Sequence, residues 1–180
     1  GELHDRWVAR HPSPPPAAPE GPPGGPGTRR SDIFVSYASG DRAAARTLVE
    51  ALVKIGGDVV WFDRHDLTAG ADWRATIVSA IRRCSLFLPL LSTSTEARQE
   101  GFFRLEWDEG CDRDRTIQGR PFIFPIVIDA DYTGNAARYE LVPEAFRKHQ
   151  FGHAPGGVPS ERLLQELVAA IRGLRRSDTT

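Results

Sequence analysis

The segment Asp32-Ile-Phe-Val-Ser-Tyr-Ala-Ser-Gly-Asp-Arg42 joins a short apolar run to a polar turn, and an amphipathic stretch follows it. The run from Ile33 to Tyr37 predicts a buried strand. The stretch from Ala43 to Ile55 predicts a helix, because its apolar residues recur at helical spacing, and Gly56-Gly57 ends it. A strand followed by a helix is therefore the unit with which this fold begins.

The same unit repeats along the chain. Further strands are predicted at Val59 to Phe62, Ser85 to Leu91, Phe122 to Ile128 and, briefly, near Gln150-Phe151. Further helices are predicted at Trp73 to Arg83, at about Glu100 to Arg115 and in a last segment that carries Leu163, Leu164, Leu167, Val168, Ile171 and Leu174. Because parallel neighbours need crossover connections, this alternation predicts an α/β fold with a five-stranded, mostly parallel sheet covered by helices on both faces.

Two prolines, Pro89 and Pro125, lie inside predicted strands. Proline lacks the backbone N–H that a ladder uses, and it belongs at edges or bulges. We therefore expect irregular strand pairing at both positions.

The composition excludes several classes of protein. With 180 residues, of which 40% are hydrophobic and 26% are charged, one globular domain and a tail are expected. The formal net charge of −1 gives no broad attraction to nucleic acid or anionic lipid, so neither is expected as a direct partner. There is no membrane-length apolar run and no signal peptide, so we expect a soluble, cytoplasmic protein. Cys84, Cys111 and the scattered histidines lack the spacing of a metal site, and no metal is expected.

The first thirty residues differ from the rest of the chain. The absence of methionine indicates a piece of a longer protein. Residues 1–11 are interpreted as the end of an upstream sensor module or as a remnant of cloning. Residues 12–30 are rich in proline and glycine, which build neither a helix nor a ladder, and they predict a flexible linker. The domain itself is predicted at residues 31–176, with a tail at 177–180.

Glu106 is the candidate functional residue of the third predicted helix. Phe103, Trp107 and Cys111 recur every four residues and predict the buried stripe of that helix. Phe102 and Glu106 lie about 100° round the helix from the stripe, at a border able to face the crevice at the carboxyl ends of the strands. The alternative is a solvated surface glutamate beside a phenylalanine that only packs.

Several segments resemble, in chain order, the motifs of Toll/interleukin receptor (TIR) domains. Residues 32–42 resemble the first box of the family, and Trp61 to Trp73 resembles its second strand and the following BB loop. Leu86 to Ser92 resembles the third strand and its serine, and Phe102-x-x-x-Glu106 matches an aromatic residue one turn before a glutamate. The resemblance covers roughly Ser31 to Arg175.

The resemblance implies a flavodoxin-like three-layer sandwich and one of two functions. Some TIR domains are adaptors that assemble with other TIR domains. Others cleave NAD⁺ at the nicotinamide–ribose bond, releasing nicotinamide and ADP-ribose or a cyclic form, with a glutamate on the third helix. By this resemblance Glu106 is the catalytic residue, and Phe102, where tryptophan is common, is a substrate-binding residue. NAD⁺ is then a substrate, no cofactor is expected, and the protein is a prokaryotic effector of antiviral defence that self-assembly activates.

This chemistry can run on one carboxylate. The nicotinamide of NAD⁺ is a cationic pyridinium that leaves as a neutral base, so its departure needs no general acid. The transition state places positive charge on the ribose, as in glycoside hydrolysis. A fixed carboxylate stabilises charge that exists only on the way over the barrier.

The loop after the first strand offers further substrate contacts. Tyr37, Ser39 and Arg42 present a ring, a hydroxyl and a guanidinium at the same end of the sheet. An equally open alternative is that this loop only makes a turn, with Asp41 capping the next helix and Gly40 shaping the turn.

The second loop and two serines complete the candidates. By the resemblance, Asp63 contacts substrate, and the loop from Asp63 to Asp72 mediates self-association and gates the site. An ordinary exposed polar loop has much the same sequence. Ser36 and Ser92 are expected to hydrogen-bond backbone rather than ligand.

Two other functions compete with NAD⁺ cleavage. The first is a noncatalytic TIR module that recruits partners through the loop from Asp63 to Asp72. The second is a nucleoside deoxyribosyltransferase-like enzyme, which is related in fold and also uses a glutamate against an N-glycosidic bond. A phospho-receiver domain is disfavoured, because the third strand leads into Leu91-Ser-Thr-Ser-Thr with no aspartate.

Overall fold

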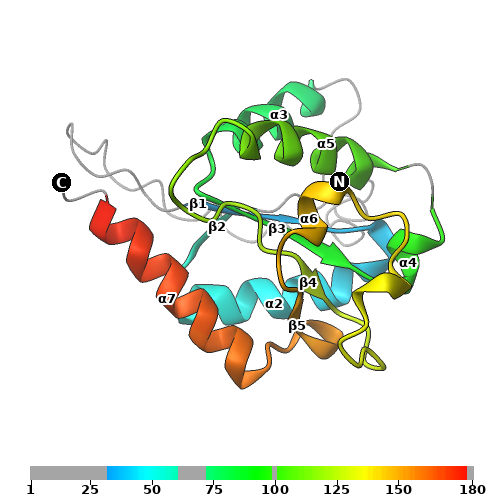
Figure 1. Ribbon diagram of the computed structural model, residues 1–180. Coiled ribbons are helices and arrows are strands. Elements are labelled where there is room, and N and C mark those ends of the chain that lie inside the picture. The colour runs from blue at the N-terminus through cyan, green and yellow to red at the C-terminus, as the bar shows by residue number, and fades with distance from the viewer. Residues whose placement is uncertain (1–31, 61–71, 99–100, 178–180) are drawn as a thin grey trace, which may run out of the picture.

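A computed structural model describes residues 32–60, 72–98 and 101–177 of the chain (Figure 1). Its centre is a five-stranded parallel sheet with the strand order β2-β1-β3-β4-β5. The strands are β1 (Asp32–Ser36), β2 (Asp58–Val60), β3 (Leu86–Leu91), β4 (Ile126–Val127) and β5 (Gly152–His153). The prediction of a five-stranded, mostly parallel sheet is confirmed.

The helices connect these strands as crossovers. They are α2 (Arg42–Lys54), α3 (Trp73–Arg83), α4 (Thr93–Glu96), α5 (Phe102–Asp114), α6 (Glu144–Arg147) and α7 (Glu161–Ser177). Three single 3-10 turns add η1 (Ser39–Asp41), η3 (Ala136–Arg138) and η4 (Pro155–Gly157). None of the helices in residues 32–60, 72–98 and 101–177 is both long and apolar enough to span a membrane.

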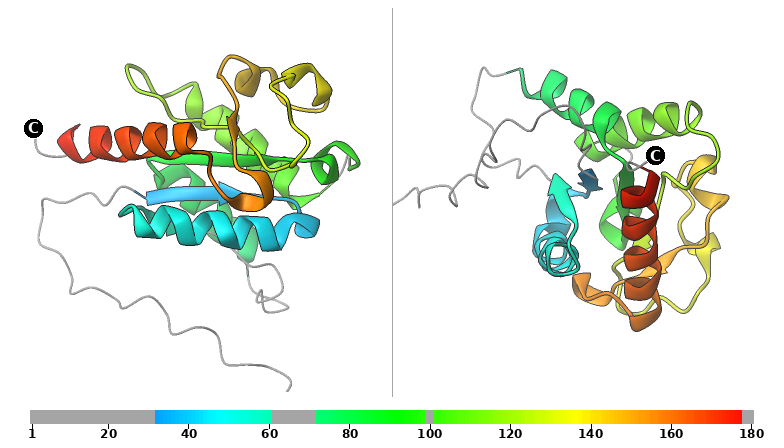
Figure 2. Two further views of the ribbon diagram at one scale, coloured as in Figure 1. Left: turned by 90° about the horizontal axis from the view of Figure 1, so that it is seen from below. Right: turned by 90° about the vertical axis from the view of Figure 1, so that its left-hand side faces the viewer.

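The helices form two layers, one on each face of the sheet. Helices α2 and α7 lie on one face, and α3 and α5 lie on the other (Figures 1 and 2). The alternation of side chains along β1 explains this arrangement. Ile33 and Val35 pack in a buried cluster with residues of α2 and α7, whereas Phe34 packs with residues of α3 and α5. Both faces are apolar, as a parallel sheet requires, and the three-layer prediction is confirmed.

Both prolines affect strand pairing: Pro125 stands just before β4 and outside its ladder, which confirms the irregularity there, whereas Pro89 lies inside β3. Pro89 pairs with Ser36 in a regular β1–β3 ladder, so the expected irregularity is wrong on that side. On the other side, the amide of Phe87 donates to the carbonyl of Phe122 (2.8 Å), but the next paired residue of β3 is Leu90. Because Pro89 has no N–H to donate toward β4, that ladder is interrupted. The predicted strand from Phe122 to Ile128 is therefore reduced to a bridge at Ile123 and the two residues of β4.

The fifth strand lies two residues later than predicted. It is Gly152–His153 rather than Gln150-Phe151, and the amide of Gly152 donates to the carbonyl of Pro125 (2.9 Å). A Cβ at Gly152 would collide with the side chain of Leu163, so the close approach of α7 favours glycine here. Glycine has low strand propensity, and the pattern of the sequence therefore pointed to the wrong pair.

Helix α5 approaches the sheet closely at Gly110. A Cβ at this position would lie 2.7 Å from the ring of Phe87, which is a residue of β3. The missing side chain lets the helix backbone rest on that ring, and Phe103 and Trp107 fill the space along the same side. This contact fixes the height of α5 above β1 and β3 and so the height of Glu106.

Three parts of the sequence interpretation lie outside the described residues. They are the upstream segment with its linker up to residue 31, most of the loop from Asp63 to Asp72, and residues 178–180. The last helix ends at Ser177, one residue beyond the predicted limit of the domain.

Candidate functional site

Glu106 is buried at the carboxyl end of β1. It lies in the second turn of α5, and its side chain is only 4% exposed. Its Oε2 accepts a hydrogen bond from the Oγ of Ser36, the last residue of β1. The alternative of a solvated surface glutamate is therefore wrong. Glu106 lies in the buried stripe of α5 itself, with Phe103 and Trp107, and not merely at its border.

Phe102 lies at the surface, one turn before Glu106. Its side chain is 47% exposed, and its ring meets the edge of Trp73 at a centroid distance of 4.4 Å and an interplanar angle of 84°. Trp73 is the first residue of α3 and Phe102 is the first residue of α5, so the two rings join the starts of the two helices on this face. An aromatic pair of this geometry is favourable beyond its buried area.

The structure separates the predicted substrate-binding residues. Tyr37 is 4% exposed and belongs to the core cluster with α2 and α7, on the face of the sheet opposite Glu106. Tyr37 therefore lies apart from Glu106, and contact of its ring with substrate stays a prediction. Ser39 is exposed in η1 and accepts a hydrogen bond from Arg98 Nη1 (3.0 Å), and Arg42 is half-buried at the start of α2. Asp63 lies outside the described residues.

The loop after β1 is held differently from the turn that the sequence suggested. Asp41 stands at the N-cap of α2 without a side-chain capping bond. Its Oδ2 instead accepts from Ser92 Oγ (2.5 Å), at the end of β3. Gly40 has no positive φ, and its lack of a side chain leaves room for Ser94, whose Oγ would lie 3.3 Å from a Cβ there. The capping prediction for Asp41 is wrong, because the carboxylate binds across the sheet edge and not along its own helix.

The two serines have carboxylate partners that the sequence did not suggest. Ser36 donates to Glu106, so the expectation of a backbone partner is wrong for its hydroxyl. Ser92 caps α4, and its Oγ accepts from the amide of Thr95 (3.2 Å), which confirms a backbone partner. It also donates to Asp41. A serine that donates to a carboxylate therefore stands at the end of β1 and directly after β3.

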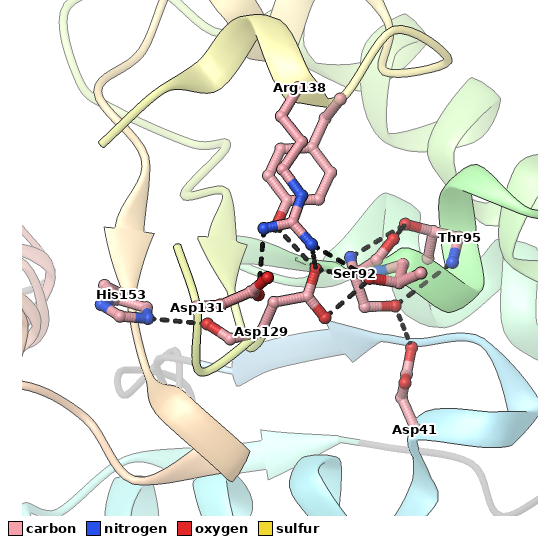
Figure 3. Close-up of polar contacts among 9 residues, drawn as sticks. Asp41, Ser92, Thr95, Asp129, Asp131, Arg138 and His153 are labelled. Atoms are coloured by element: carbon pink, nitrogen blue, oxygen red, sulfur yellow. Dashed lines mark hydrogen bonds and ion pairs between the residues drawn. The ribbon is translucent and has the colours of Figure 1, made fainter. Parts of the chain in front are cut away.

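Asp129 organises a second polar network at the same edge of the sheet (Figure 3). Its carboxylate accepts from the amide of Thr93 (3.2 Å), from Thr93 Oγ1 (3.1 Å) and from the hydroxyl of Tyr139 (2.7 Å). Its carbonyl oxygen accepts from His153 Nε2 (2.9 Å). Arg138 lies between Asp129 and Asp131, at 3.7 Å and 2.9 Å. This network fastens the segments that follow β3 and β4 to each other and to His153 of β5.

Burial and the neighbouring carboxylate act together on Tyr139. They raise the pKa of its hydroxyl well above the usual value, so that it stays a hydrogen-bond donor at physiological pH. Asp129 could have been found from the sequence. It is the first polar residue after the predicted fourth strand, and polar residues at carboxyl ends of parallel strands gather at one edge.

Two further side chains fasten the start of α5 to its surroundings. The guanidinium of Arg104 donates to the carbonyls of Thr95 (2.7 Å) and Leu141 (2.6 Å), and it lies 4.8 Å from the ring centroid of Trp107. Glu96 accepts from the amide of Leu141 (3.1 Å) in return. Sequence reasoning missed both residues, because their partners are backbone groups, and the one they share, Leu141, lies in a loop far along the chain. They hold the turn that carries Glu106 in place.

Replacing Asp41 by asparagine should raise the melting temperature in a pH-dependent way. Burial raises the pKa of the Asp41 carboxyl above its usual 3.8, although the hydroxyls of Ser92 and Ser94 oppose this shift. The stabilising contribution of such a group is fully present below the unfolded pKa and is lost as the pH rises through the folded pKa. Asp41→Asn should therefore raise Tm at pH 7, by at most about 4 °C because solvent screens a partly exposed carboxylate.

The gain should shrink toward pH 4, where less of the wild-type carboxyl is ionised. Thermal melts of both proteins at pH 7 and pH 4 measure it. An equal gain at both pH values would show that the charge of Asp41 is not its cause.

Comparison with known proteins adds an independent view of the chain. A family model described as "TIR domain" matches residues 33–153. No curated protein matches the chain. A solved structure of a metazoan TIR-STING receptor from C. gigas in complex with 2',3'-cGAMP is similar, with 16% identity and a TM-score of 0.53, over 77% of this chain and 38% of that one. The crystal structure of the RPS4 and RRS1 TIR domain heterodimer is similar, with 13% identity and a TM-score of 0.52, over 82% of this chain and 99% of that one.

These likenesses to solved structures concern the fold, since the identities are low. The chain spans well under half of the receptor chain that it resembles. The family model, by contrast, covers more than half of this chain and includes β1 from Ile33 onward, Glu106 and the network around Asp129. The chain therefore belongs to the TIR domain family.

Proposed function

We propose that this TIR domain is an NAD⁺ glycohydrolase that cleaves the nicotinamide–ribose bond. The products are nicotinamide and either ADP-ribose or a cyclic ADP-ribose. Glu106 is the catalytic residue, and Ser39, Arg42 and Phe102 are the described residues proposed to contact the nucleotide. Asp63 in the following loop is proposed to join them. We further propose that the protein acts as a cytoplasmic effector of prokaryotic antiviral defence, activated by self-assembly under the control of an upstream sensor.

The burial of the Glu106 carboxylate is the single observation that carries this proposal. A carboxylate is costly to remove from water, and glutamate is rarely fully buried. Glu106 is nevertheless 4% exposed at the carboxyl edge of a parallel sheet, where ligands of such folds bind. Strongly buried ionisable groups at such an edge are candidates for functional groups.

The surroundings of Glu106 suit an electrostatic role. Phe103 and Trp107 flank it on α5, and Ile77 of α3 belongs to the same apolar cluster. A charge in surroundings of low dielectric constant acts more strongly on a neighbouring charge than the same charge in water. As nicotinamide departs, the ribose becomes positively charged, and the carboxylate of Glu106 is proposed to stabilise that charge.

Phe102 is proposed to bound the site on its open side. Its side chain is 47% exposed and its ring packs against Trp73 in a T-shaped pair, so an aromatic group at the surface beside Glu106 is proposed to contact a planar ring of the substrate. Ser39 and Arg42 come from the loop that follows β1, at the same edge of the sheet. They are suited to hydroxyl and phosphate groups of the nucleotide.

Self-assembly is supported by the family and by one structural relative. The RPS4 and RRS1 TIR domains form a heterodimer. For this chain we propose that contacts between TIR domains, through the loop from Asp63 to Asp72, complete the site around Glu106.

The test is NAD⁺ turnover measured as a function of protein concentration. Released nicotinamide is quantified chromatographically, and the second product is identified by mass. We expect turnover per molecule to rise with concentration, because assembly completes the site. An assembled sample that releases no nicotinamide would leave a noncatalytic interaction module as the better description, and base exchange between deoxynucleosides would indicate a deoxyribosyltransferase.

A further inference from the structure

We propose that Ser36 is the positioning residue for the Glu106 carboxylate, and that its hydroxyl orients the carboxylate for catalysis without touching the substrate. This inference rests on the proposed NAD⁺ cleavage. It assigns a role to a residue of the sheet, 70 positions from Glu106 in the sequence, that supplies a hydrogen-bond donor to one defined oxygen, Oε2.

The place of Ser36 in the sheet fixes the direction of its side chain. It is the last residue of β1, and its Cα pairs with that of Pro89 in the β1–β3 ladder. Side chains alternate along a strand, so Ser36 points to the same face as Phe34, toward α3 and α5. Glu106 extends from α5 toward this position, and the two side chains meet between the sheet and the helix.

A serine at this position departs from the local pattern. Ile33, Phe34 and Val35 are apolar, and both faces of the sheet are covered by apolar helix residues. An aliphatic side chain at position 36 would fill the same space, and it would not bury a polar hydroxyl as serine does. Residues that break a local rule in an otherwise consistent element are expected at functional sites.

Burial excludes Ser36 from direct contact with substrate in this structure. Its exposed fraction is 0%, compared with 4% for Glu106 and 47% for Phe102. The order from the sheet outward is therefore the Ser36 hydroxyl, the Glu106 carboxylate and then the surface. A hydrogen bond to one carboxylate oxygen limits rotation of the carboxylate. The action of Ser36 on the substrate must pass through Glu106.

The expected consequence is a separation of kcat from KM. Loss of the Ser36 hydroxyl removes the hydrogen bond that orients Oε2 of Glu106 toward the position where positive charge develops. An interaction that matters only in the transition state lowers kcat and leaves substrate binding nearly unchanged. Partners that orient the ligands of a metal ion typically contribute about 10- to 100-fold, and we expect an effect of similar size for a partner that orients a catalytic carboxylate.

The structure offers a matched control in Tyr139. Its hydroxyl is also buried and also donates to a carboxylate, that of Asp129 (2.7 Å), in the network that follows β4. Tyr139→Phe removes one buried hydroxyl from a carboxylate that has no proposed part in the reaction. It therefore reproduces the folding cost of Ser36→Ala without its effect on Glu106.

The experiment measures kcat and KM for NAD⁺ together with thermal unfolding, at a concentration where the wild type is assembled. We expect Ser36→Ala to lower kcat about 10- to 100-fold with KM within about twofold of wild type. Tyr139→Phe should lose thermal stability to a similar degree and keep the kcat of the wild type. Ser36→Thr, which retains the hydroxyl, should recover kcat to within about threefold of the wild-type value.

Ser36→Cys keeps the measurement possible if the alanine variant does not fold. A thiol is a weak donor of similar size, so kcat should fall in the same direction and by less. Unchanged kcat in Ser36→Ala, or in Ser36→Cys where alanine is not tolerated, would overturn the role of Ser36 alone, as would an equal fall in Tyr139→Phe. Absence of nicotinamide release by the wild type would instead overturn the proposed function.

Discussion

Glu106→Gln should reduce NAD⁺ cleavage by about 10²- to 10³-fold while the protein stays folded. Glutamine has nearly the same shape and can still accept a hydrogen bond from Ser36, but it carries no negative charge. The variant therefore removes the electrostatic stabilisation of the ribose cation and little else. Nicotinamide release under saturating NAD⁺ measures the effect, with circular dichroism as the check of folding.

Glu109→Gln supplies the matched control for this prediction. It is the same chemical change on the same helix, three residues further on. The Glu109 side chain is 21% exposed and lies 3.5 Å from Arg82 Nη2, in an ion pair between α5 and α3. A partly exposed ion pair contributes about 1 kcal/mol or less, and the rate of Glu109→Gln should stay close to that of the wild type. Equal activity of Glu106→Gln and the wild type would remove Glu106 from the mechanism.

The sequence pointed to Glu106 as the candidate residue but did not predict how deeply its side chain is buried. The spacing of Phe103, Trp107 and Cys111 indicated the buried side of α5 and placed Glu106 beside it. In the structure Cys111 is only half-buried, whereas Gly110 is fully covered and rests on the ring of Phe87. The helix is therefore turned so that Glu106 enters the interior. A hydrophobic pattern cannot show this rotation of the helix about its axis. Glycine adds no hydrophobic side chain to the pattern, yet Gly110 is the residue that lets α5 lie close to the ring of Phe87.

The partners of the polar residues were the least predictable part of the site. Asp41 and Ser92 are 51 residues apart, and Thr93 and Asp129 are 36 apart. Local rules assign a serine or aspartate to the nearest backbone amide. Here the carboxyl ends of β1, β3 and β4 bring side chains together across strands, and these contacts replace the local cap at Asp41. The strand order decides which side chains meet in this way, and the strand order depends on the packing of the whole domain.

The alternation of strands and helices along the chain predicted the parallel sheet. Its irregularities are caused by single residues. Trp73 and Arg83 were predicted as the ends of the second helix, and α3 has these bounds. By contrast, β4 is shortened by a proline of its neighbour, and β5 is placed by the contact of a glycine with α7. The length of β4 and the position of β5 depend on which element lies beside them in space. The pattern of a single segment therefore cannot predict them.

Gly157→Ala should be strongly destabilising. Gly157 closes the turn η4 with φ +90°, a conformation that residues with a Cβ rarely adopt. A Cβ there would overlap the carbonyl oxygen of Ala44, in the backbone of α2. Because helix backbone cannot move aside as a side chain can, η4 must separate from α2. We expect a loss of about 3–5 kcal/mol in unfolding free energy, which corresponds to a fall in Tm of roughly 10 °C or more.

Gly156→Ala distinguishes the steric overlap from the backbone conformation. Gly156 is the preceding residue, it also has a positive φ of +59°, and a Cβ there meets nothing within 4 Å. Its substitution should therefore cost only the conformational part, about 1–2 kcal/mol. Thermal or urea unfolding of the two variants beside the wild type gives the difference. Equal losses would mean that strain alone acts at both positions and that the packing of η4 on α2 contributes little. A larger loss of unfolding free energy at Gly157 would establish that the packing of η4 on α2 stabilises the fold. These two segments lie more than a hundred residues apart in the sequence.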